Sequence, residues 1–451
     1  MKLKNKRALV VGAGKSGLAV ASFLADKGAA VTLTDASQPV FPEGELERLV
    51  AAGVRLALGG YPEVKQDSYD LVVMSPGIPL TVEPAQLASK HGIALTGEME
   101  LAYRFCRALL VAVTGTNGKT TTTALLGEIF KQSGKRTLVA GNIGIPLVKE
   151  VERYGQQDII VAEVSSFQLE TTTDFKPKIA LILNITPDHL DRHGTMEGYI
   201  NAKAKIFTNQ NAGDCTILNY DDPLTRSLAD RTPARVIWFS RREELQEGVY
   251  VVEGRIIANL GGVAEFICRK DEIGIPGAHN LENALAAIAV ARTMGVAIPD
   301  LVHTLKTFQG VPHRLEFVAE IDGVRYINDS KGTNPDASIK ALEAYSERIV
   351  LIAGGKNKGS NFDAFAEKIK EKARVLVVLG QSAAAIAAAA RAKGFEEILY
   401  ANNFEEAVLL AHQAARPGEI VLLSPACASW DMFENYEERG GLFKKIVMSF
   451  T

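Results

Sequence analysis

The sequence has few cysteines, and none of them is spaced as a metal or redox motif. The four are Cys106, Cys215, Cys268 and Cys427, and no two form a C-x-x-C pair. This spacing argues against a zinc ribbon and against a disulfide framework. We therefore expect a protein of the reducing cytoplasm.

The chain also lacks a long hydrophobic run and a large excess of charge of either sign. No stretch of about 18 or more apolar residues occurs, so we expect no membrane span. The formal net charge of −3 gives no reason to expect a nucleic acid or an anionic membrane as partner. Lys2, Lys4 and Lys6 precede an apolar run as in a signal peptide, but glycines interrupt that run. A strand followed by a glycine turn explains it better.

The length of 451 residues suggests about three domains of ~150 residues each. Apolar runs alternate with helical patterns along most of the chain, which predicts an α/β fold. We expect a Rossmann-like domain over residues 1–97 and a central phosphate-loop (P-loop) domain with a mostly parallel sheet over 98–304. A second Rossmann-like domain is expected over 305–451.

The clearest motif is a glycine-rich loop between an apolar run at residues 108–113 and a helical pattern from residue 122. The loop backbone and the helix N-terminus can cradle phosphate, Lys119 can reach the β/γ-phosphates, and a threonine can hold Mg²⁺. The loop is shorter than the usual spacing, and a chance turn before a helix is the alternative. We expect ATP to bind at Gly115, Thr116, Asn117, Gly118, Lys119, Thr120 and Thr121.

A second glycine motif, G-x-G-x-x-G, lies near the N-terminus at Gly12, Gly14 and Gly17, and Asp35 follows at the end of the next strand. The simplest interpretation is a βαβ unit that binds NAD, with Asp35 on the ribose. The same geometry binds any pyrophosphate, including that of a UDP-sugar. Close packing without a ligand is the third possibility.

Carboxylate and imidazole side chains stand where later strands end. Glu163 closes an apolar run at residues 158–164, where a carboxylate is costly unless it is paired or bound to a metal. Mg²⁺ is the natural partner beside a phosphate loop, and a salt bridge is the alternative. His189 lies where the next strand meets its loop. The helical pattern that carries Lys203, by itself, indicates a solvated basic face.

The last third of the chain places polar loops after apolar strands. Two such loops, at residues 354–359 and 424–431, lie where parallel sheets bind ligands. Arg314 stands in a linker and is either functional or simply solvated. Asn280 and Asn283 can contact an adenine edge or cap a helix.

Together these motifs resemble the Mur ligases of peptidoglycan synthesis over essentially the whole chain. Within that family, residues 163–170 and 424–431 resemble the D-glutamate-adding branch. Another Mur-type or a folylpolyglutamate-type amide ligase is the near alternative. The resembling segments are 115–121, 141–144, 163–170, 184–193, 279–284, 312–316 and 328–334.

The resemblance implies ATP-driven amide formation through an acyl phosphate. The implied substrates are UDP-N-acetylmuramoyl-L-alanine, D-glutamate and ATP, with two Mg²⁺ ions, in a cytoplasmic monomer. An NAD-dependent oxidoreductase and a non-catalytic nucleotide switch are the hypotheses from other classes.

Site residues follow by resemblance. Lys119, Glu163, His189 and Lys203 are implied to be catalytic, with Thr120, Glu163, His189 and a carbamylated Lys203 as metal ligands. Asn280, Asn283, Arg314 and Asp329 are implied to complete the ATP site. The UDP-sugar is assigned to Gly14, Lys15, Ser16, Ala36, Ser37, Gly77 and Asn142, and D-glutamate to Thr333, Lys358, Ser429 and Tyr436.

Overall fold

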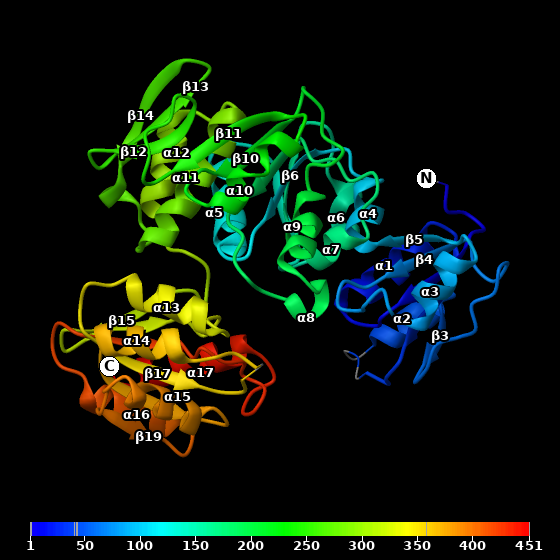
Figure 1. The fold of residues 1–451 in the computed structure, drawn as a ribbon. Coiled ribbons are helices and arrows are strands. Elements are labelled where there is room, and N and C mark those ends of the chain that lie inside the picture. Colours follow the sequence, from blue (N-terminus) through cyan, green and yellow to red (C-terminus); the bar gives the residue numbers. More distant parts are fainter. Residues whose placement is uncertain (1, 40, 42–43, 358, 451) are drawn as a thin grey trace. The chain divides into compact units, whose positions relative to one another are not determined.

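The computed structural model describes residues 2–39, 41, 44–357 and 359–450. These form two compact units. One contains the residues up to Asp271 together with Asn283–Leu305, and the other contains Glu272–Glu282 and the chain from Lys306 onward. The first unit holds two sheets and the second holds one (Figure 1). The expectation of three α/β domains is confirmed.

The first sheet is parallel throughout, in the order β3-β2-β1-β4-β5. Successive residues of β1 point to opposite faces, so Val10 packs with the α1 side while Leu9 and Val11 pack with the α3 side. Burial on both faces explains the nearly continuous apolar run. The elements are β1 (Arg7–Val11), α1 (Lys15–Asp26), β2 (Ala30–Asp35), α2 (Glu45–Ala51), β3 (Arg55–Leu58), β4 (Leu71–Met74), α3 (Glu83–Lys90) and β5 (Ala94–Gly97).

The central sheet has nine strands in the order β14-β13-β12-β11-β10-β9-β6-β8-β7. Strands β7 to β12 pair in parallel with their neighbours, and β12, β13 and β14 form an antiparallel meander at one edge. Its strands are β6 (Leu109–Thr114), β7 (Thr137–Gly141), β8 (Ile159–Glu163), β9 (Ile179–Ile182), β10 (Cys215–Asn219), β11 (Arg235–Ser240), β12 (Gly248–Val252), β13 (Arg255–Leu260) and β14 (Val263–Arg269).

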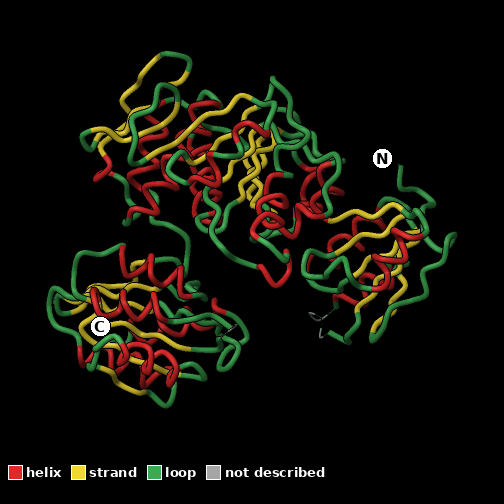
Figure 2. Tube along the Cα trace, viewed as in Figure 1, coloured by secondary structure: helices red, strands yellow, loops and turns green. Residues whose placement is uncertain are grey.

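Helices connect and cover the parallel part of this sheet, as the colouring by element type shows (Figure 2). Strand β6 lies between β8 and β9. After β6 the chain passes through α5 to β7 at the edge of the sheet, returns to β8, and then crosses to β9 on the other side of β6. Such a reversal of strand order is where open α/β sheets bind ligands. The helices are α4 (Glu98–Tyr103), α5 (Lys119–Gln132), α6 (Leu147–Glu150), α7 (Ser166–Glu170), α8 (Leu190–His193), α9 (Met196–Ala204), α10 (Pro223–Arg226), α11 (Ala278–Thr293) and α12 (Ile298–Thr307), with 3₁₀ turns at Val151–Arg153, Ala229–Arg231 and Lys270–Glu272.

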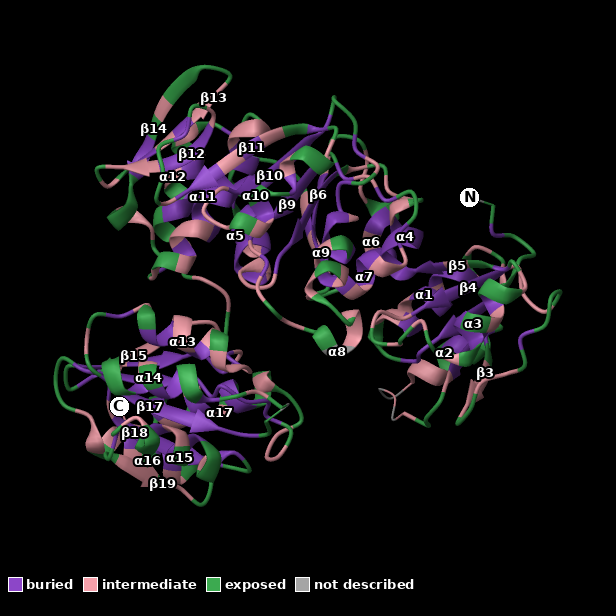
Figure 3. Ribbon diagram, viewed as in Figure 1, coloured by how far each residue is buried: buried purple, intermediate pink, exposed green. Residues whose placement is uncertain are grey.

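The third sheet has the order β15-β16-β20-β17-β18-β19, parallel except for the β15–β16 hairpin. Alternate residues of β17 enter two separate cores, which explains its wholly buried sequence (Figure 3). The elements are β15 (Glu316–Ile321), β16 (Val324–Asn328), α13 (Pro335–Glu343), β17 (Ile349–Gly354), α14 (Asp363–Lys372), β18 (Ala373–Leu379), α15 (Ala383–Ala392), β19 (Ile398–Tyr400), α16 (Phe404–Ala414), β20 (Ile420–Leu423) and α17 (Tyr436–Met448).

Within the part of the chain that the structure describes, no helix is both long enough and apolar enough to cross a membrane.

Candidate active site

The phosphate loop leaves β6 and enters α5, as the glycine spacing predicts. Gly118 has φ +84°, and a Cβ on it would collide with the Asn283 side chain. Asn184, after β9, holds the loop from the side: its backbone carbonyl accepts from the Thr116 N–H at 2.9 Å and its side chain accepts from the Asn117 N–H at 2.8 Å. The cradle therefore depends on Asn184, which sequence reasoning did not single out as a site residue.

Two lysine side chains donate hydrogen bonds to the same carbonyl of this loop. Lys119 and Lys203 each donate from Nζ to the Gly115 carbonyl oxygen at 2.8 Å, and Lys119 also donates to the Thr116 carbonyl. Lys203 is 1% exposed and lies over the Tyr199 ring at 4.5 Å. Burial, followed by the nearby charge of Lys119, lowers the pKa of Lys203 well below its ordinary value. Lys203 is thus not on a solvated face, and its surroundings disfavour the charged form of its amine.

Glu163 is the last residue of β8 and is 2% exposed. Its Oε1 accepts from the Asn142 side-chain amide at 2.8 Å, whereas its Oε2 is buried without a hydrogen-bond partner. Strand pairing sets Glu163 opposite Val113, at the end of β6 where the phosphate loop begins. An orphaned carboxylate oxygen in that position fits a divalent cation, because it would otherwise pay an uncompensated desolvation cost. Thr120, the second residue of α5 and also buried, carries a hydroxyl at the start of the helix that follows β6.

His189 caps α8 with φ +53°, in the left-handed region that is uncommon for a residue with a side chain. Its ring faces Asp188 at 3.5 Å and packs on Phe167 at 4.7 Å between centroids. Among the described residues, no group of three or more His, Cys, Asp and Glu side chains is close enough to hold a metal ion.

The N-terminal glycine turn, between β1 and α1, is closely packed. Gly17 has no room for a side chain, because a Cβ would strike the Gly12 carbonyl. Asp35 does not point outward to a ribose: its carboxylate accepts from the backbone N–H groups of Ala13 and Ser37 at 2.9 Å and from the Ser37 hydroxyl. This internal use of Asp35 and Ser37 disfavours the NAD interpretation.

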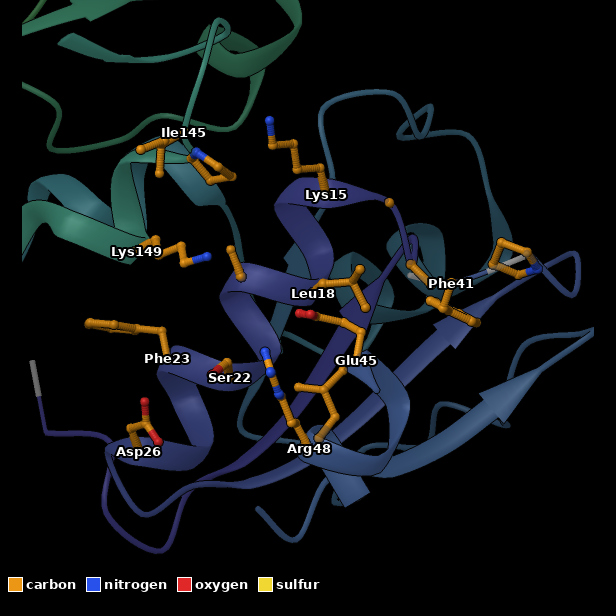
Figure 4. Close-up of a pocket in the computed structure, with 16 residues that line it drawn as sticks. Lys15, Leu18, Ser22, Phe23, Asp26, Phe41, Glu45, Arg48, Ile145 and Lys149 are labelled. Carbon is orange, nitrogen blue, oxygen red and sulfur yellow. The ribbon is translucent and has the colours of Figure 1, made fainter. Parts of the chain in front are cut away.

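A pocket of about 720 Å³ extends from this turn along α1, between α1, α2 and the start of α6 (Figure 4). Leu18, Phe23 and Phe41 form an apolar wall. The charged residues of the lining are Lys15, Arg48, Lys149, Asp26 and Glu45. Lys15 also donates to the Gly144 carbonyl at 2.5 Å, which ties the turn to the loop after β7. That loop carries Asn142, the partner of Glu163. Ser16 lies beside Lys15 in α1, Ala36 follows β2, and Gly77 follows β4, all at the carboxyl edge of the first sheet.

In the C-terminal unit, Asp329 and Arg314 are neighbours. The Asp329 carboxylate accepts from the Ser424 hydroxyl at 2.7 Å, and burial raises its pKa to about 7. Arg314 has a buried Nε without a partner. Nearby, Lys331 lies over the Tyr436 ring at 5.1 Å, and the buried guanidinium of Arg439 donates to the Ser330 and Cys427 carbonyls.

The remaining predicted residues of this unit are polar and lie in loops or at helix starts. Thr333 follows β16, Ser429 follows β20 and is buried, and Tyr436 begins α17. Asn280 lies in the first turn of α11 and donates to the Pro276 carbonyl at 2.7 Å. Lys358 lies outside the described residues. Sequence reasoning did not single out Arg439. It placed Ser424 in a predicted ligand-binding loop but did not foresee its hydrogen bond to Asp329, because that bond joins distant segments.

Family comparisons agree with this architecture. Residues 6–97 match the MurD-like N-terminal domain of Mur ligases, 113–291 match the Mur ligase middle domain, and 313–427 match the Mur ligase glutamate ligase domain. A three-domain chain with these matches and with the phosphate loop described above belongs to the Mur ligase family. Membership of this family implies the use of ATP.

Its relatives include the UDP-N-acetylmuramoylalanine–D-glutamate ligase of Pelotomaculum thermopropionicum, 67% identical over 98% of each chain. The enzyme of the same name from Thermoanaerobacter sp. is 50% identical over 99% of each. Among solved structures, UDP-N-acetylmuramate-alanine ligase MurC from Thermotoga maritima has a TM-score of 0.61 at 21% identity, covering 99% of this chain and all of that one. That likeness shows the shared fold.

Proposed function

We propose that this protein joins D-glutamate to UDP-N-acetylmuramoyl-L-alanine, with hydrolysis of ATP to ADP and phosphate, in peptidoglycan precursor synthesis. The observation that carries this proposal is the 67% identity, over nearly the full length of both chains, to a relative bearing the name of that ligase. The orphaned carboxylate of Glu163 beside the phosphate loop is the geometric support. We further propose that the protein acts in the cytoplasm as a monomer.

The reaction proceeds in two balanced steps. A carboxylate oxygen of the UDP-sugar peptide attacks the γ-phosphorus of ATP, and the bond to ADP breaks to give an acyl phosphate. The amine of D-glutamate then attacks the acyl carbon, phosphate leaves, and the nitrogen loses a proton. Both steps depend mainly on positioning and on neutralising charge.

Lys119 and the backbone N–H groups of residues 115–121 hold the phosphates in this proposal. Mg²⁺, when bound, neutralises phosphate charge and polarises the γ-phosphoryl group. Thr120 and Glu163 would hold one ion. Asn142 fixes the Glu163 carboxylate through its Oε1 and leaves Oε2 available.

A second ion would be held by His189 and a carbamylated Lys203. Carbamate formation needs a neutral amine, which adds to CO₂ and loses a proton. Burial of Lys203 favours that neutral form, because it lowers the pKa of the amine. The modification converts a buried cation into an anion able to bind a metal.

The substrate residues are proposed from the strand-end positions. Gly14, Lys15, Ser16, Ala36, Ser37, Gly77 and Asn142 would contact the UDP-sugar, Thr333, Lys358, Ser429 and Tyr436 would contact D-glutamate, and Asn280, Asn283, Arg314 and Asp329 would contact ATP.

The test is phosphate release from ATP and Mg²⁺, with each substrate supplied alone and together. We expect release only when UDP-N-acetylmuramoyl-L-alanine and D-glutamate are both present. Release with this sugar and another amino acid, or with a folate, would replace the proposal with another amide ligase. ATP binding without any release would favour a nucleotide switch.

A further inference from the structure

Ser166, His193 and Glu170 form a linked trio beside the proposed active site. His193 Nε2 lies 3.0 Å from the Ser166 hydroxyl, and its Nδ1 lies 3.4 Å from the Glu170 carboxylate. The carboxylate favours a proton on Nδ1, which leaves Nε2 to accept a hydrogen bond from the serine. This connectivity matches that of a nucleophile, a base and an orienting acid.

Burial excludes a nucleophilic role for this trio. Ser166 is 3% exposed, and the His193 side chain is 4% exposed. A substrate carbonyl cannot approach the serine oxygen without displacing packed side chains. The trio must therefore act on the protein itself.

The positions of Ser166 and His193 show which helices the trio joins. Ser166 is the first residue of α7, three residues after the proposed metal ligand Glu163, and His193 is the last residue of α8. The His193 ring stacks on Phe167 at 5.5 Å between centroids, and Phe167 in turn packs on His189.

On its other side, the His193 ring meets Tyr199 of α9 at 5.2 Å. The Tyr199 hydroxyl lies 3.2 Å from the Thr116 hydroxyl in the phosphate loop, and the Tyr199 ring lies under Lys203 Nζ. A column of rings, His189–Phe167–His193–Tyr199, thus joins α7, α8 and α9 to the phosphate loop. His193 is the member that also hydrogen-bonds to the start of α7.

We propose that His193 is a positioning residue that locks α7 and α9 against the phosphate loop, so that Glu163 and Lys203 keep the spacing that metal binding requires. The charged and titratable groups around it are Glu170, His189, Arg192, Tyr199 and Lys203. This inference rests on the proposed metal roles of Glu163 and Lys203.

The experiment is a double-substitution cycle. His193→Phe keeps a ring and removes both polar contacts, and Ser166→Ala removes the hydroxyl alone. We expect each to lower kcat about tenfold, with KM for ATP changed less than about twofold, and the double variant to be no worse than either single one. His193→Gln, which can still bond to Ser166, should restore most of kcat. His91→Phe, at the end of α3, is the matched control and should be unchanged.

An equilibrium readout separates this inference from the proposed reaction. Binding of Mn²⁺ to the enzyme–ADP complex, followed by electron paramagnetic resonance, should weaken several-fold in His193→Phe and remain normal in His91→Phe. Three results would overturn the inference. They are additive losses of kcat in the cycle, a normal kcat in His193→Phe, and a lower unfolding temperature with unchanged kcat and Mn²⁺ binding. If the wild type releases no phosphate with its expected substrates, the proposed function fails, and Mn²⁺ binding still decides the role of His193.

Discussion

At the scale of single residues, the central domain buries the side chain of a lysine, Lys203. Lys203 is buried against Tyr199 and shares the Gly115 carbonyl with Lys119, so its charged form is disfavoured both by desolvation and by a like charge. In our proposal, carbamylation would replace this cation by an anion and so relieve the repulsion between Lys203 and Lys119.

Lys203→Ala should leave the fold intact and remove most of the activity, by at least about a hundredfold. The amine forms one hydrogen bond, and its loss leaves no buried charge behind. Phosphate release and circular dichroism measure the two effects, with the exposed Lys131→Ala as control. Near-normal turnover of Lys203→Ala would contradict the carbamate role.

A second residue, Glu98, makes stability depend on pH. It begins α4, is fully buried, and accepts from the Val148 N–H at 2.8 Å, while its Oε2 has no partner. Burial raises its pKa to about 7 from an ordinary value of 4.5. The folded state therefore binds a proton that the unfolded state releases between these two values. Its stabilising contribution is complete below pH 4.5 and is lost as the pH rises through 7.

Glu98→Gln mimics the neutral acid at every pH. We expect the variant to match the wild type near pH 5 and to be more stable at pH 8, by up to about 3 kcal/mol. Unfolding midpoints of both proteins at the two pH values test this. An equal difference between the proteins at both values would show that Glu98 does not titrate in this range.

At the scale of elements, the phosphate loop is shaped by strand and helix ends together. Gly118 needs its positive φ to turn into α5, and it also needs the absence of a Cβ because Asn283 of α11 packs against it. Gly53 has nearly the same φ, +83°, but open space around it. A substitution at Gly53 therefore measures the cost of the backbone conformation alone, whereas a substitution at Gly118 adds the collision with Asn283.

Gly118→Ala and Gly53→Ala should both lose about 1 kcal/mol of stability from the backbone conformation. Gly118→Ala alone should also weaken ATP binding at least tenfold, because the loop must shift away from Asn283. Calorimetric titration with ATP measures this. Equal ATP affinity in the two variants would mean that the loop accommodates a side chain.

At the scale of the whole molecule, one arginine links the first and central domains. Arg192 of α8 donates to the Glu170 carboxylate at 2.6 Å and to the Ile78 carbonyl at 3.1 Å. Ile78 follows Gly77, which we propose to contact the UDP-sugar. The loop that we propose to contact the UDP-sugar is thereby connected to α7 and α8.

Arg192→Met should raise KM for the UDP-sugar several-fold and change KM for ATP little, because the loop after β4 loses its anchor. Steady-state kinetics with each substrate varied in turn provide the measurement. Arg153→Met, which removes an exposed surface pair, is the control. A rise in KM for ATP of the same size would point to a general loosening of the domain.

The sequence by itself determined the local features of this protein. Apolar runs and glycine spacing are local, so they identified the three α/β domains, the phosphate loop and the carboxylate at the end of β8. Resemblance of motifs supplied the family, and the comparisons confirm it.

Tertiary structure alone decided which polar groups are buried and what they contact. The pattern around Lys203 indicated a solvated helix face, yet packing of α9 on the phosphate loop buries that amine. Asp35 holds its own turn, and Asn184 holds a loop 67 residues away in sequence. Burial and hydrogen bonding depend on contacts between segments that are far apart in the sequence, and a local sequence pattern does not predict those contacts.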